Sequence, residues 1–116
     1  MGGIIVGERL HNKLVRDGIP AVIENDGHRA ITHIVAPDER DEVLIVKLTE
    51  EVRELGQALT RDEIIAERAD IAEVLRVYDE LIGLTSEIIE KARRDKFAKR
   101  GGFTKFIFLE KEITND

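Results

Sequence analysis

The chain contains no cysteine, which excludes disulfides, zinc sites built from thiolates and enzymes with a thiol nucleophile. It has no apolar run near the ~18 residues that a membrane-spanning helix needs. With a net charge of −6 it lacks the broad basic surface that binds nucleic-acid polymers. The first residues lack the charged flank and long apolar stretch of a signal peptide. We therefore expect a cytoplasmic protein without a membrane or nucleic-acid partner.

What the chain does contain indicates a folded protein. It has 116 residues, of which 42% are apolar and 36% are charged, a balance typical of globular proteins and not of disordered ones. This length suffices for one domain with a modest core, and no internal repeat or low-complexity segment is visible. We predict a single domain over residues 1–116. Because many proteins share such a composition, function has to be sought in the residue patterns.

Hydrophobic periodicity predicts three long helices. Leucine and valine recur at intervals of three and four through residues 38–59. The next helix begins with a capping box of Thr60 and Glu63 and ends at Gly83. A third helix spans residues 85–97, and its basic residues lie near its end, where cations suit the helix dipole. These three segments supply most of the predicted fold.

Shorter elements are predicted before and after these helices. Residues 19–24 form a short helix with Pro20 in its first turn, where proline is tolerated. Two segments rich in β-branched or aromatic residues, 30–36 and 103–110, are predicted to be strands that pair with each other. The sequence thus predicts a mainly α fold, a helical bundle with a small two-stranded β-ribbon.

Acidic residues lie close to the apolar sides of the first two long helices. At about 100° per residue, Glu51 is about 60° from the stripe of the first helix and Glu67 about 40° from the stripe of the second. An unpaired buried carboxylate is costly, whereas hard divalent cations prefer oxygen ligands. The two helices together therefore predict a polycarboxylate metal site made of five acids: Glu50, Glu51, Glu54, Glu67 and Asp70.

The alternative is that these acids form ordinary solvated helix faces. E-E-x-x-E and E-x-x-D are both common on such faces. Lys47, Arg53 and Arg68 are close enough in sequence to form salt bridges with them. The sequence leaves both interpretations open.

The acidic pattern resembles that of the all-α nucleoside triphosphate pyrophosphatase superfamily, which includes MazG-like proteins, dimeric dUTPases and phosphoribosyl-ATP pyrophosphohydrolases. Residues 12–20, Asn-Lys-Leu-Val-Arg-Asp-Gly-Ile-Pro, resemble the NKLVRDKIP opening of a small MazG-related subfamily labelled phosphoribosyl-ATP pyrophosphohydrolase-like. Residues 99–103 resemble its KRGGF close. Together the motifs cover about residues 11–110, and the chain departs from the pattern at Gly18, where the subfamily commonly has lysine.

The resemblance implies an all-α nucleoside triphosphate pyrophosphatase-type bundle, with one MazG-like domain over residues 1–116. The implied activity is Mg²⁺-dependent cleavage of a nucleoside triphosphate between the α and β phosphates, giving the monophosphate and pyrophosphate in a house-cleaning role. Mn²⁺ is a possible substitute for Mg²⁺. Members assemble as dimers or tetramers, so a homo-oligomer is expected.

Carried over residue by residue, the resemblance makes Glu51, Glu54, Glu67 and Asp70 the expected metal ligands. Glu50 is expected to be a further ligand or to orient the attacking water, so the expected catalytic residues are Glu50 and Glu54. The basic motifs imply a set of substrate-binding residues near the phosphates: Asn12, Lys13, Arg16, Lys99 and Arg100.

Two rival functions stay open at this point. One is phosphoribosyl-ATP pyrophosphohydrolysis, which the same metal site would serve. The other belongs to a different class, a non-catalytic helical binding module whose acids form salt bridges or bind a partner.

Overall fold

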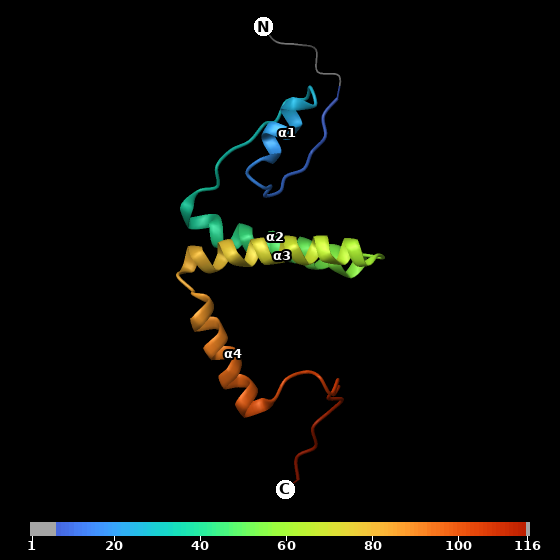
Figure 1. Cartoon of the computed structure of the whole chain (residues 1–116), viewed down its shortest axis with the longest axis vertical. Helices are drawn as coiled ribbons and strands as arrows, with labels where there is room; N and C mark the ends of the chain where they lie inside the picture. Colours follow the sequence, from blue (N-terminus) through green and yellow to red (C-terminus); the bar gives the residue numbers. More distant parts are fainter. Residues whose placement is uncertain (1–6, 116) are drawn as a thin grey trace. The chain divides into compact units, whose positions relative to one another are not determined.

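The computed structural model describes residues 7–115, and this part of the chain is mainly helical (Figure 1). The chain divides into two compact units, Met1–Ile82 and Gly83–Asp116. The first unit holds a short helix, a turn of 3-10 helix and two long helices, and the second holds one helix. The prediction of a mainly α fold is therefore confirmed. None of the helices within residues 7–115 has the length and apolar character needed to cross a membrane.

The centre of the first unit is a hairpin of α2 (Arg40–Gln57) and α3 (Arg61–Ile82), which pack against each other (Figure 1). Helix α2 follows the 3-10 turn η1 (Pro37–Glu39), so the predicted helix over residues 38–59 begins with a tighter turn and ends at Gln57. Ala58 already has an extended backbone conformation. The hairpin turn is therefore only three residues long.

A capping box starts α3, as predicted. The backbone N–H of Glu63 donates to Thr60 Oγ1 at 3.1 Å. The Glu63 carboxylate accepts from the backbone N–H of Leu59 at 3.0 Å, one residue before the cap. The first bond satisfies an N–H group in the first turn of α3, which has no partner within the helix, and the second holds the backbone just before the cap. The box thereby fixes where α3 begins.

The two remaining helices also match their predicted segments. α1 (Ile19–Asn25) has proline in its first turn. α4 (Ser86–Arg100) starts at Thr85, whose side chain accepts from the backbone N–H of Ile88 at 3.2 Å. It continues three residues beyond the predicted end and stops at Gly101, which has a φ of 76°. Glycine adopts this left-handed conformation without steric cost, so it makes a natural helix end.

The predicted two-stranded β-ribbon is not seen in residues 7–115. Neither 30–36 nor 103–110 forms a strand. Their apolar side chains are largely exposed: Ile31 is 84%, Ile34 86% and Phe106 91% exposed. β-branched and aromatic residues favour strands because they fit a pleated, half-buried surface. These two segments lie in separate units, and neither unit has a sheet within residues 7–115 that the segment could join.

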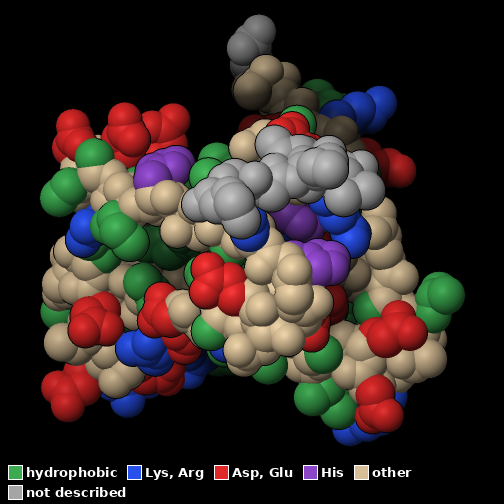
Figure 2. Space-filling view, turned by 90° about the horizontal axis from the view of Figure 1, so that it is seen from above, with side chains coloured by type: hydrophobic (Ala, Val, Ile, Leu, Met, Phe, Trp, Pro, Cys, Tyr) green, Lys and Arg blue, Asp and Glu red, His purple; other side chains and the backbone are tan. Residues whose placement is uncertain are grey.

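The core of the hairpin is small. Among the described residues, the only buried hydrophobic side chains are Leu44 and Ile71, and the buried polar side chain is Glu51. Other members of the predicted stripe stay accessible, such as Val52 at 52% and Leu59, beyond the end of α2, at 90%. Figure 2 shows hydrophobic side chains, in green, at the surface beside acidic and basic ones. A carboxylate thus occupies one of the few buried positions of this molecule.

Candidate metal centre

Five carboxylates gather in the α2–α3 hairpin. One oxygen from each of Glu50, Glu51 and Glu54 lies within 4.8 Å of the other two. One oxygen from each of Glu51, Glu67 and Asp70 forms a second such group. Glu51 belongs to both groups and so connects the two helices. The structure therefore brings together all five acids that the sequence predicted as metal ligands.

Helical spacing explains how these side chains meet. On α2, the side chains of Glu50 and Glu51 lie about one turn from that of Glu54, on the same side of the helix. On α3, Glu67 and Asp70 are three residues apart and are neighbours on the helix surface. Because Glu51 lies near the apolar stripe of α2, its side chain is enclosed in the contact between the helices.

Two of these carboxylates carry buried oxygens without a partner. Glu51 is 4% exposed, and its Oε2 atom accepts no hydrogen bond. Glu67 Oε2 is buried and also has no partner. A buried carboxylate oxygen without a donor loses the hydration it had in the unfolded chain, which destabilises the fold. These two oxygens are therefore available to a cation.

Burial and the crowding of carboxylates in the cluster raise the pKa of Glu67. Burial, together with the hydrogen bonds and charges of the neighbouring carboxyl groups of Glu51 and Glu54, raises the pKa of Glu67 from 4.5 to about 7. Burial disfavours the charged form, and nearby like charges do the same. Without a cation, the cluster therefore favours the protonated, neutral form of Glu67 more than water does.

Lys47 offsets part of this charge from within α2. Its Nζ atom lies 3.2 Å from Glu51 Oε1 and 3.4 Å from Glu50 Oε1. Burial lowers the pKa of Lys47, but the hydrogen bond to Glu51 and the charges of Glu50 and Glu51 outweigh this effect, so the pKa is raised. Lys47 thus forms the salt bridges that the alternative interpretation foresaw. Arg53 and Arg68, by contrast, form no ion pair within residues 7–115.

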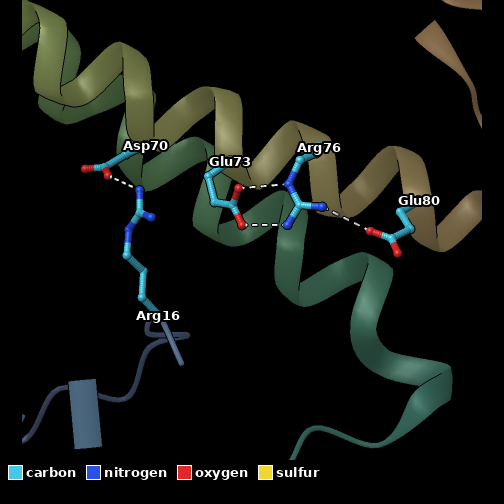
Figure 3. Close-up of polar contacts among 5 residues, drawn as sticks. All are labelled: Arg16, Asp70, Glu73, Arg76 and Glu80. Carbon is cyan, nitrogen blue, oxygen red and sulfur yellow. Dashed lines mark hydrogen bonds and ion pairs between the residues drawn. The ribbon is translucent and has the colours of Figure 1, made fainter. Parts of the chain in front are cut away.

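A second cation comes from the segment before α1. Arg16 Nη2 lies 2.6 Å from Asp70 Oδ1 (Figure 3). The hydrogen bond to Asp70 and the charge of Asp70 raise the pKa of Arg16. Arg16 was predicted as a phosphate-binding residue, but its contact with a predicted metal ligand was not. Because 54 residues separate the pair, no local pattern in the sequence signals this contact.

The other predicted substrate-binding residues lie in two places. Asn12 and Lys13 are exposed in the segment before α1, and Asn12 has a φ of 46°, a conformation that asparagine tolerates. Lys99 and Arg100 form the last turn of α4 in the second unit, directly before Gly101.

A hollow that the sequence did not predict adjoins the acidic cluster. Its volume is about 290 Å³. Glu54 and Glu67 line it together with residues from the turn end of the hairpin: Gln57, Ala58, Glu63 and Ala66. Two of the five acids thus line this open hollow.

Comparison of this chain with family models, with curated proteins and with solved structures gave no match in any of the three.

Proposed function

We propose that this protein is a Mg²⁺-dependent nucleotide pyrophosphohydrolase. The observation that carries this proposal is the buried Glu51. It has one oxygen without a partner, and it belongs to two carboxylate groups on two helices. Lys47 reaches only Oε1 of this carboxylate, and the buried Oε2 is costly unless a further cation satisfies it.

The chemistry of the donor set supports a hard cation. Every potential ligand in the two groups is a carboxylate oxygen, without histidine or cysteine. Oxygen ligands suit Mg²⁺ and Mn²⁺, whereas softer metals favour nitrogen and sulfur. Glu51, Glu54, Glu67 and Asp70 would hold the ion. When bound, Mg²⁺ polarises a phosphoryl oxygen and lowers the pKa of a coordinated water.

The proposed reaction is hydrolysis of a phosphoanhydride. A water oxygen attacks the α phosphorus of a nucleoside triphosphate, and the bond from the α phosphorus to the α–β bridging oxygen breaks. The products are the nucleoside monophosphate and pyrophosphate. Glu50, at the edge of the cluster beside Lys47, orients this water and accepts its proton.

Basic residues of the flanking motifs bind the phosphates in this proposal. Arg16 already lies at the cluster through Asp70. A guanidinium matches the geometry of phosphate oxygens through two parallel hydrogen bonds. Lys13 takes the same role by its resemblance to the subfamily motif. These cations neutralise the charge that develops on the leaving pyrophosphate.

The active form of this enzyme is a homo-oligomer. Apolar side chains on α2 and α3 remain accessible, including Val46 at 64%, Val52 at 52% and Ile65 at 55%. Burying such surface against a second hairpin is favourable, at roughly 25 cal/mol per Å² of apolar area. A second copy would supply the layer that this two-helix core lacks.

A non-catalytic binding module is the second candidate, and three ion pairs favour it. Lys47 pairs with Glu50 and Glu51, and Arg16 pairs with Asp70, so the protein's own cations already neutralise part of the cluster. In that case the acids serve stability. Their amide variants should then destabilise the fold.

Pyrophosphate release from a panel of nucleotides distinguishes the two candidates. We expect release by the wild type in Mg²⁺, none in EDTA, and a loss of at least about 100-fold in Glu54→Gln and Asp70→Asn, since both variants remove a metal-holding charge. Glu80→Gln is the matched control, because Glu80 lies on α3 and pairs with Arg76 outside the cluster. A wild type that releases no pyrophosphate from any nucleotide, with destabilised amide variants, would refute the enzyme.

A further inference from the structure

One candidate ligand of the acidic cluster already has a cationic partner. Asp70 contributes an oxygen to the group it forms with Glu51 and Glu67. The same side chain accepts a hydrogen bond of 2.6 Å from Arg16 Nη2 (Figure 3). A divalent cation bound by this group would therefore share one carboxylate with a guanidinium.

We propose that Arg16 is an exchangeable counterion of the acidic cluster. It neutralises Asp70 in the metal-free protein, and it leaves Asp70 for the phosphates of the substrate once that carboxylate holds a divalent cation. This inference rests on the proposed function and assigns Arg16 two successive partners.

Electrostatics gives the reason for the exchange. A carboxylate has two oxygens and can accept from more than one donor. However, an arginine and a divalent cation on the same side chain repel each other at short distance. Arg16 also lies in the field of Glu51, a member of the cluster, and a cation bound there would reduce the negative charge that attracts Arg16.

Exposure and attachment make Arg16 the cation that can leave. Its side chain is 57% exposed and that of Asp70 is 37% exposed, and exposed ion pairs contribute little stability. Arg16 also lies in a loop before α1. Lys47 differs in both respects, because its side chain is 17% exposed and it sits on α2 one turn before its partners. Lys47 is thus a fixed counterion and Arg16 an exchangeable one.

The released guanidinium stays where phosphates are expected. Asp70 belongs to the cluster that is proposed to bind the substrate's metal ion, so Arg16 needs to change only its hydrogen-bond partner. Arginine binds phosphate oxygens through the same fork of N–H groups that binds a carboxylate. One residue thus serves the cluster before substrate arrives and the substrate afterwards.

Calorimetric titration with Mn²⁺ alone, without nucleotide, tests the exchange. Arg16→Gln should bind Mn²⁺ about two- to fivefold more tightly than the wild type, the range that an exposed ion pair allows. Arg76→Gln is the matched control, because it removes one arginine charge from α3, where Arg76 pairs with Glu73 and Glu80, which belong to neither carboxylate group (Figure 3). Its affinity should stay within about twofold of the wild type. Arg16→Lys keeps the charge and should fall near the wild type.

A second titration, with inorganic pyrophosphate in the presence of Mg²⁺, should change in the opposite direction. Arg16→Gln should bind pyrophosphate more weakly although it binds the metal more tightly. Equal Mn²⁺ affinities of Arg16→Gln and Arg76→Gln, or weaker Mn²⁺ binding by Arg16→Gln, overturn the exchange and leave the metal site standing. A wild type that binds no Mn²⁺ overturns the proposed function together with this inference.

Discussion

Glu67 keeps its proton to a higher pH than an ordinary glutamate, because burial and the neighbouring carboxyl groups raise its pKa from 4.5 to about 7. The folded chain therefore binds this proton more tightly than the unfolded chain. The resulting stabilisation is fully present below the unfolded pKa and is lost as pH rises through the folded pKa. The metal-free protein should therefore become less stable as the pH rises from 4.5 to about 7.

Thermal unfolding at about pH 5 and about pH 8 in EDTA measures this effect. The wild type should be less stable at the higher pH. Glu67→Gln, which resembles the protonated form, should lose much of that difference, while Glu80→Gln should keep it. Adding Mg²⁺ at about pH 8 should restore stability by mass action. A wild type whose stability does not fall over this pH range would contradict the raised pKa of Glu67.

At the scale of the secondary-structure element, the capping box stabilises the start of α3 after the three-residue turn. Thr60→Ala removes the side-chain acceptor for the backbone N–H of Glu63 and should lower the free energy of unfolding by about 1 kcal/mol. Thr49 supplies a matched control, since its hydroxyl bonds back to the Ile45 carbonyl inside α2. Thr49→Ala should be neutral or slightly stabilising, because alanine is the better helix former. Urea denaturation of both variants makes the comparison, and equal losses would refute a special role for the cap.

Local signals predicted the helices well and the strands poorly. Apolar periodicity, Thr60 and Gly83 mark helix ends with information that lies within a few residues. The segments 30–36 and 103–110 have strand composition, but a strand also needs a neighbour, which depends on distant parts of the chain.

In the candidate site, too, local contacts could be predicted from the sequence and a distant one could not. Helical spacing predicted the clustering of the five acids. The same spacing could also have predicted the contact of Lys47 with Glu50 and Glu51, which are three and four residues away. The contact between Arg16 and Asp70 could not be predicted in this way, because it joins a loop to a helix 54 residues later.

At the scale of the whole molecule, the exposed apolar side chains of the hairpin favour assembly. Light scattering should give at least about twice the chain mass of 13.1 kDa. Val52→Glu places a charge on an apolar position that is 52% exposed, and it should shift the protein toward the monomer. Gln57→Glu, near the end of the same helix, is the control for added charge and should leave the mass unchanged. A wild-type mass near that of one chain at micromolar concentration would argue against the oligomer.

Glu51 belongs to both carboxylate groups, and this sharing has a consequence for how substitutions combine. Changes at sites that share no partner usually add, whereas changes that meet at one group do not. In a double-mutant cycle on metal affinity, Glu51 should couple to Glu50 through one group and to Asp70 through the other. Glu50 and Asp70, which share no group, should be closer to additive. Glu51 would therefore link two otherwise separate groups of ligands, so a loss of metal affinity at that residue could not be assigned to either helix alone.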